Sequence, residues 1–159
     1  MSSSMRWDRL AVFVATGGWV GFLSPVPGTL GSVLGLMLVG AMSWIPTVAW
    51  QAVVITALIL GGIPVCSLAA RCLGGQKDPG AIIYDEIVVM PVVFLGVALL
   101  GTSTLLMGFV FFRLFDIVKP PPCKLLERLP GGAGIIADDL MAAVYAHLTL
   151  RIALGLLSG

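Results

Sequence analysis

The feature that most constrains this chain is the absence of charge over most of its length. No Asp, Glu, Lys or Arg occurs in residues 10–70 or in residues 87–112. Of the 159 residues, 58% are hydrophobic and 11% are charged, whereas about 25% of the residues of a soluble domain are charged. A soluble domain of this length cannot bury so much apolar surface. We therefore predict an integral membrane protein in which residues 1–159 form one domain.

Prolines divide the first uncharged stretch into helices. Prolines in residues 25–28 and 44–47 break the pattern, because proline cannot continue a helix. We therefore expect one somewhat short helix over residues 29–43 and a second over residues 48–73. The last helix is expected over residues 134–157.

Two further segments leave their relation to the membrane open. Residues 87–112 are interrupted by Gly, Thr and Ser at 101–104, so they form either one long tilted span or a hairpin of two short helices. Residues 10–23 are amphipathic at best and are expected to lie in the interface or to enter it partway. The predicted fold is an all-α, integral membrane helical bundle with about four spanning helices plus short interfacial or re-entrant helices.

The charged residues fall into a few clusters. These are Arg6, Asp8 and Arg9; then Arg71, Lys77, Asp78, Asp85 and Glu86; then Arg113, Asp116, Lys119, Lys124, Glu127 and Arg128; then Asp138 and Asp139, with Arg151 alone near the end. If residues 87–112 form a hairpin, these clusters share one side of the membrane and the turns on the other side carry no charge. Basic segments stay in the cytoplasm, so we expect a multi-pass protein with its charged face cytoplasmic. A single span would separate the clusters.

The acidic residues are the main functional signal. Asp85 and Glu86 begin one apolar helix, Asp138 and Asp139 lie in the first turn of another, and Asp116 ends an apolar run. Acidic residues in first turns also favour the helix dipole, which is an alternative explanation for any single pair. Three acidic sites beside apolar helices point instead to function. Carboxylate oxygens suit Mg²⁺, which also takes water and substrate phosphate as ligands.

A basic segment follows the second uncharged stretch. The spacing of three puts Arg113, Asp116 and Lys119 on roughly one face of a helix, which a run of prolines then ends. These residues can form plain ion pairs or extend to the interface. Alternatively, Arg113 and Lys119 form a phosphate clamp.

A glycine-rich turn precedes the first apolar helix. Gly28 and Thr29 follow two prolines, and free backbone N–H groups at such a turn can hold an anion. Thr29 can equally be an ordinary helix cap.

Several other functions are excluded by the residue types present. The net charge of +1 gives no reason to expect nucleic-acid binding. The three cysteines are an odd number without a CxxC pair, so they indicate neither a disulfide framework nor a zinc site. The single histidine, His147, lies inside the last helix, so a phosphohistidine mechanism lacks its second histidine. No dinucleotide-binding glycine motif occurs.

Four blocks, taken together, resemble the bacterial phosphatidylglycerophosphatase A family. They are residues 23–32 (LSPVPGTLGS), 78–86 (DPGAIIYDE), 112–121 (FRLFDIVKPP) and 131–140 (GGAGIIADDL). The resemblance implies a compact helical bundle of about six helices in the bacterial inner membrane. It also implies Mg²⁺-dependent conversion of phosphatidylglycerophosphate to phosphatidylglycerol and phosphate at the cytoplasmic face. Tyr84 and Pro121 depart from the usual family pattern beside the site.

The expected mechanism combines these groups. Asp85, Glu86, Asp138 and Asp139 are expected to supply the metal site, with one member of each pair in a supporting role, because adjacent helical residues point about 100° apart. Asp116 is expected to act as a further ligand or as the base that orients water. Lys77, Arg113, Lys119, Gly28 and Thr29 are expected to bind the substrate phosphate.

Other readings of the chain remain open from the sequence. An Asp nucleophile is an alternative to metal-activated water. A small transporter or a non-enzymatic assembly subunit is the alternative function. Charge-free spans disfavour a transporter, which usually has ionisable groups near the bilayer midplane. A phosphatidyltransferase would need an Asp-rich helix in a fixed context, which is absent. The oligomeric state is left open.

Overall fold

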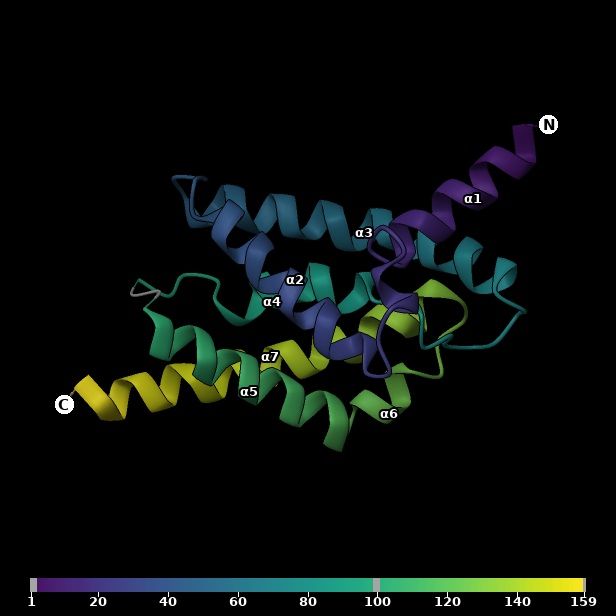
Figure 1. Ribbon diagram of the computed structural model, residues 1–159. Coiled ribbons are helices and arrows are strands. Elements are labelled where there is room, and N and C mark those ends of the chain that lie inside the picture. The colour runs from purple at the N-terminus through teal and green to yellow at the C-terminus, as the bar shows by residue number, and fades with distance from the viewer. Residues whose placement is uncertain (1–2, 99–100, 159) are drawn as a thin grey trace.

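The computed structural model describes residues 3–98 and 101–158, and every regular element among them is a helix. Their order is α1 (Ser3–Ala15), the 3-10 helix η1 (Val20–Phe22), α2 (Pro27–Met42), α3 (Val48–Cys72), α4 (Tyr84–Val93), α5 (Thr102–Val118), α6 (Cys123–Leu126) and α7 (Gly132–Ser158). Figure 1 shows a bundle in which the long helices α3 and α7 lie roughly along the same axis but run in opposite chain directions. The all-α prediction is confirmed for these residues.

The number of helices that could span a membrane is lower than predicted. Only α3 and residues Gly132–Leu157 of α7 are long and apolar enough among the described helices. α2 has 16 residues and α5 has 17, which gives each a length of roughly 24–26 Å against a hydrocarbon core of about 30 Å. The expectation of about four spanning helices therefore reduces to two candidates. These two apolar helices suggest membrane association.

The ambiguous segment 87–112 folds back on itself. α4 ends at Val93, the chain turns through Gly96 with a φ of 70°, and α5 begins at Thr102. The break therefore comes earlier than the expected interruption at 101–104, most of which begins α5. Glycine tolerates a positive φ without a steric penalty, so Gly96 allows the chain to turn after α4. The hairpin alternative is the one that the structure adopts.

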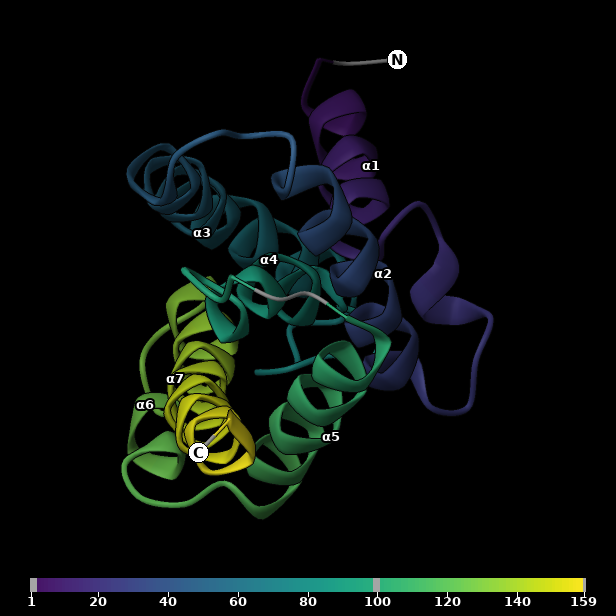
Figure 2. The same cartoon turned by 90° about the vertical axis from the view of Figure 1, so that its left-hand side faces the viewer.

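The short helix α4 lies at the centre of the bundle. It packs against α2, α3, α5 and α7, and Figure 2 shows it between α2, α3 and α7. Its apolar residues are buried around the whole circumference, as expected for a helix without a polar face. At Gly35 of α2, a Cβ atom would lie 2.5 Å from the Cβ of Met90. The missing side chain therefore allows α2 to approach α4 closely.

Most of the charged residues lie near helix ends that meet at one end of the bundle. In Figure 1, the beginnings of α2, α4 and α7 lie at the same end as the last turns of α3 and α5, on the right of the view. The exception is Arg151, whose Nη1 donates a 2.9 Å hydrogen bond to the carbonyl of Gly96. His147 Nδ1 lies 3.0 Å from the carbonyl of Val93. These two side chains of α7 satisfy carbonyl groups where α4 ends, at the uncharged end.

Candidate active site

Three buried carboxylates meet between the first turn of α4 and the early part of α7. Because α7 already begins at Gly132, Asp138 and Asp139 are not in its first turn, contrary to the expectation from the sequence. Asp85, Glu86 and Asp139 each offer an oxygen, and these oxygens lie within 4.8 Å of one another. Asp85 Oδ1 and Glu86 Oε2 have no hydrogen-bond partner among the described residues. A buried carboxylate without a partner is strongly unfavourable. The cluster therefore fits a divalent cation with oxygen ligands.

The pKa values of Asp85 and Glu86 are consistent with a cation site made of carboxylate oxygens. Burial raises the pKa of Asp85 well above its usual range, and the nearby carboxylates of Glu86 and Asp139 raise it further. Burial also raises the pKa of Glu86 to about 7, although a hydrogen bond with Asp85 opposes this shift. A cation among these oxygens would favour their ionised forms.

These carboxylates line a cavity of about 260 Å³, and the side chains of Arg113 and Lys119 also line it. Its lining consists of Pro27, Gly28, Asp78, Gly80, Ile82, Asp85, Glu86, Arg113, Asp116, Lys119, Asp138 and Asp139. A second cavity of about 240 Å³ lies near the turn between α2 and α3, and no charged residue lines it. The chemistry of the linings therefore assigns the functional site to the first cavity.

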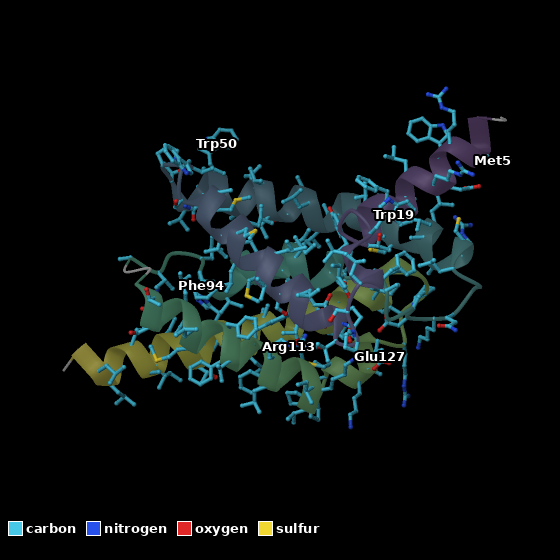
Figure 3. The ribbon with its side chains drawn as sticks, viewed as in Figure 1. Met5, Trp19, Trp50, Phe94, Arg113 and Glu127 are labelled. Atoms are coloured by element: carbon cyan, nitrogen blue, oxygen red, sulfur yellow. The ribbon has the colours of Figure 1, made fainter. Side chains whose placement is uncertain are left out.

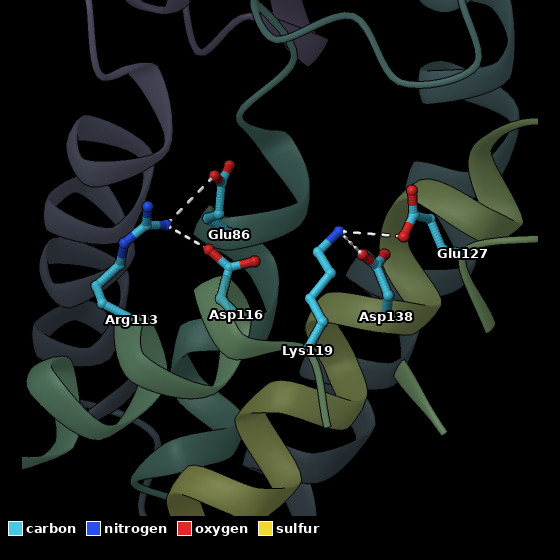
Figure 4. A network of polar contacts seen from close by, with 6 residues as sticks. All are labelled: Glu86, Arg113, Asp116, Lys119, Glu127 and Asp138. Atoms are coloured by element: carbon cyan, nitrogen blue, oxygen red, sulfur yellow. Dashed lines mark hydrogen bonds and ion pairs between the residues drawn. The ribbon is translucent and has the colours of Figure 1, made fainter. Parts of the chain in front are cut away.

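Two cations at this cavity each pair with two acidic residues, and Figure 4 shows the two groups side by side. Arg113 Nη1 lies 2.7 Å from Asp116 Oδ2 and 3.7 Å from Glu86 Oε1. Lys119 Nζ lies 2.6 Å from Asp138 Oδ2 and 3.5 Å from Glu127 Oε2. Arg113 and Lys119 therefore do form plain ion pairs, which was the alternative to a phosphate clamp. However, an arginine carries five hydrogen-bond donors and a lysine three. Unused donors remain available to a phosphate.

Lys119 reaches the site because α5 ends there. The sequence placed Lys119 on one helical face with Arg113, whereas the structure places it just past the end of α5 with a φ of 47°. Burial lowers its pKa, but the hydrogen bond to Asp138 and the charges of the surrounding carboxylates together more than reverse this, so the pKa is raised. Lys119 is therefore held as a cation at the cavity wall.

The adjacent acids Asp138 and Asp139 have different surroundings. Asp139 joins the carboxylate cluster, while Asp138 accepts a hydrogen bond from Lys119. The angle of about 100° between neighbouring helical side chains explains this separation. Asp138 Oδ1 is nevertheless buried without a partner among the described residues.

Of the remaining predicted site residues, only one lines this cavity. Gly28 lines it, and a Cβ atom there would overlap Glu86 Oε1 and lie 3.0 Å from Arg113 Nη1. Thr29 follows in the first turn of α2 but is not part of the lining. Lys77 is exposed in the connection between α3 and α4, outside the lining. The phosphate-binding roles of Thr29 and Lys77 stay predictions.

Two acidic residues at the site were not assigned a role from the sequence. Asp78 lines the cavity although it is an exposed residue, and partial desolvation together with the nearby Asp138 raises its pKa. Glu127 pairs with Lys119. Both occur in irregular or very short elements, where helical spacing gives no information. The signal for Asp78 was its position at the head of the block 78–86.

Comparison with known proteins identifies the family. The model of the family described as phosphatidylglycerophosphatase A matches residues 13–154. A protein of that name from Haemophilus influenzae is 34% identical over 86% of this chain and 84% of its own length. The Escherichia coli protein of that name is 32% identical over 92% of this chain and 82% of its own length.

A third relative carries a different name. A Bacteroides thetaiotaomicron protein, provisionally named phosphatidylinositol-3-phosphatase, is 29% identical over 93% of this chain and 96% of its own length. No solved structure matches the chain. All three names describe phosphatases, and the residues matched by the family model include the whole carboxylate cluster. The chain therefore belongs to the phosphatidylglycerophosphatase A family and is a phosphoric monoester hydrolase.

Proposed function

We propose that this protein hydrolyses the terminal phosphomonoester of phosphatidylglycerophosphate to phosphatidylglycerol and inorganic phosphate, with Mg²⁺, at the cytoplasmic face of the bacterial inner membrane. The names of two relatives support the substrate. The observation that carries the mechanism is the meeting of Asp85, Glu86 and Asp139 in a cavity that Arg113 and Lys119 also line. This arrangement offers separate places for a cation and a phosphate.

The carboxylate cluster would hold Mg²⁺. Asp85, Glu86 and Asp139 each supply an oxygen, and Asp138 is a further candidate through its unpartnered Oδ1. Bound there, the ion would neutralise charge on the phosphoryl group and lower the pKa of water.

The chain's own cations and dipoles would position the phosphate. Arg113 and Lys119 offer donors to the phosphate oxygens, and the backbone N–H of Gly28, at the start of α2, is a further candidate donor. Phosphoryl transfer depends mainly on positioning and charge neutralisation, so this wall supplies what the reaction requires. Asp116, held by Arg113, would accept a proton from the attacking water. The water oxygen bonds to phosphorus while the ester P–O bond breaks, and the leaving glycerol oxygen takes up a proton.

The central experiment compares two isosteric variants with a remote control. Asp139→Asn and Asp85→Asn each remove a charge from the cluster, and we expect phosphate release to fall about 100-fold or more. Asp8→Asn, in α1, serves as the matched control with unchanged turnover. The thermal shift produced by Mg²⁺ gives a second readout, which both cluster variants should lose. Full turnover in either variant, or full turnover after removal of divalent metal, would contradict the proposal.

A substrate panel separates the proposed activity from its alternatives. Phosphatidylglycerophosphate should be turned over faster than phosphatidylinositol 3-phosphate, the substrate suggested by the name of the third relative. The reverse order would reassign the substrate while keeping the reaction type. No hydrolysis of either lipid by the folded protein would restore the alternative of a small transporter or an assembly subunit.

The natural cysteines provide a test of orientation. Cys72, at the end of α3, is exposed, whereas Cys66 and Cys123 are buried. A membrane-impermeant maleimide should label Cys72 in inverted inner-membrane vesicles and not in spheroplasts. Ser43→Cys in a Cys72→Ser background is the matched control, because Ser43 is exposed beyond the other end of α2. Labelling of Cys72 in spheroplasts alone would place the site on the opposite face.

A further inference from the structure

We propose that an exposed apolar surface beside the cavity inserts into the lipid bilayer and receives the acyl chains of the substrate. We call this surface the aromatic rim and define it as Phe13, Trp19, Phe22, Leu23 and Val26. The inference rests on the proposed function, because it explains how a phosphate that remains attached to a membrane lipid reaches the carboxylate cluster. The occupant is therefore the acyl region of a bilayer.

The rim consists of apolar side chains that the fold leaves uncovered. Leu23 is 79% exposed, Phe22 51% and Trp19 46%. The Trp19 ring lies 5.8 Å from the ring of Phe13 and 6.0 Å from that of Phe22, measured between centroids. Exposed apolar patches of this kind mark interaction surfaces.

The backbone beneath the rim adopts an uncommon conformation. Gly17, Gly18 and Trp19 have consecutive positive φ values of 58°, 69° and 73°. The Thr16 hydroxyl oxygen accepts a 3.2 Å hydrogen bond from the Trp19 N–H. A tryptophan rarely adopts this conformation, so the surrounding structure imposes it.

A second contact ties the rim to the loop that leads into the site. The backbone of Gly21 packs so closely on the backbone of Ala81 that a Cβ atom would overlap the Ala81 carbonyl oxygen. Ala81 lies between the cavity-lining residues Gly80 and Ile82. The exposed rim is therefore part of an ordered platform attached to the cavity wall.

The rim continues directly into the cavity. Val26 precedes Pro27 and Gly28, both of which line the cavity. A lipid whose phosphate occupies the cavity must leave it with its glycerol and acyl chains, and an apolar surface is then needed at the opening. Figure 3 shows Trp19 towards the same end of the bundle as Glu127, which pairs with a cavity-lining lysine.

The charge pattern favours a bilayer over a protein partner. The rim lies inside the uncharged stretch 10–70, and the nearest cations in sequence, Arg6 and Arg9, precede it. Cations beside apolar aromatic residues suit anionic headgroups over an acyl region. The two apolar helices α3 and α7 already suggest that the chain is associated with a membrane.

The first test compares a lipid in vesicles with a soluble short-chain analogue of the same headgroup. The double variant Phe22→Ser/Leu23→Ser should reduce turnover of the long-chain lipid about tenfold or more. The reason is that the bilayer contact loses two apolar side chains, which the lipid would bury. Turnover of the short-chain analogue should stay within about twofold of wild type, which also shows that the variant folds. Leu125→Ser is the matched control, because Leu125 is exposed on α6 and lies outside the rim.

Three results of that test would overturn the inference. These are unchanged turnover of the long-chain lipid, an equal loss on both substrates, and the same selective loss in the control variant. Failure of wild-type protein to hydrolyse either substrate would instead refute the proposed function.

A second test measures the rim without any reaction. With Trp7, Trp44 and Trp50 replaced by Phe, Trp19 becomes the sole tryptophan, since the chain has four. This variant is reconstituted into vesicles of phosphatidylglycerol and phosphatidylethanolamine with brominated acyl chains. The brominated chains should quench the fluorescence of Trp19, whereas iodide in the water should not. Quenching by iodide would show a rim in water. Shielding from both quenchers would show a protein partner or a second copy, and either result would overturn the inference.

Discussion

Replacing Gly28 by alanine should separate activity from stability. The first turn of α2 packs so closely on the site that a Cβ atom at residue 28 would overlap Glu86 Oε1 and lie 3.0 Å from Arg113 Nη1. Both contacts involve the ends of flexible side chains, so the fold can accommodate the methyl group by moving the Glu86 carboxylate by about 1 Å. A misplacement of this size in a catalytic constellation costs about 100-fold in rate.

The stability change should be small because two effects oppose each other. Alanine favours a helix over glycine by up to about 1 kcal/mol, and this gain opposes the cost of displacing the 3.7 Å contact between Glu86 and Arg113. We therefore expect Gly28→Ala to melt close to wild type and to lose about 100-fold in kcat/KM for phosphate release.

Gly40→Ala is the matched control within the same helix. A Cβ atom there would have no neighbour within 4 Å, so activity should be unchanged and the melting temperature unchanged or slightly raised. Wild-type kcat/KM in Gly28→Ala would refute the reasoning, because it would mean that the position of Glu86 does not matter. An unfolded Gly28→Ala would refute the claim that only side-chain ends must move.

Three further variants test the packing around the site by thermal unfolding in detergent. Gly62→Ala should destabilise by about 1–3 kcal/mol, because its methyl group would overlap an aromatic ring of α4; Gly61→Ala, which meets open space, should not, and equal effects would contradict this packing. Lys119→Met should destabilise by about 3 kcal/mol by leaving the buried Asp138 carboxylate unpaired, and adding Asp138→Asn should recover most of the loss. His147→Phe should cost about 1 kcal/mol through the unsatisfied carbonyl at the end of α4, and an unchanged melting temperature would exclude that role.

Much of the fold could be predicted from the apolar stretches of the sequence and from the prolines and turn residues that interrupt them. The predicted helix over 48–73 matches α3 (Val48–Cys72), and the helix over 29–43 matches α2 (Pro27–Met42) to within two residues. Both are bounded by prolines or polar turns whose effect is local. The overcount of spans has a different origin, because hydrophobicity shows that a segment avoids water and does not show whether lipid or protein covers it. α4 is apolar and is covered by its neighbouring helices.

The site was predictable where residues share a helix and less so where loops bring them together. The pairing of Arg113 with Asp116 follows from their spacing of three along α5. The contact of Lys119 with Asp138, by contrast, depends on how the chain leaves α5 and re-enters the bundle through α6. Asp78 reaches the cavity from an irregular loop, where no periodicity constrains its direction.

The central position of α4 explains how so many acidic groups can share one buried site. Its first turn carries Asp85 and Glu86, and the positive end of the helix dipole favours their ionised forms. Its other end is held by His147 and Arg151 of α7, the same helix that contributes Asp139. α7 therefore contacts α4 at both ends and limits sliding between the two helices. A cluster fixed in this way has its carboxylates in place in advance, so the proposed cation would require little reorganisation on binding.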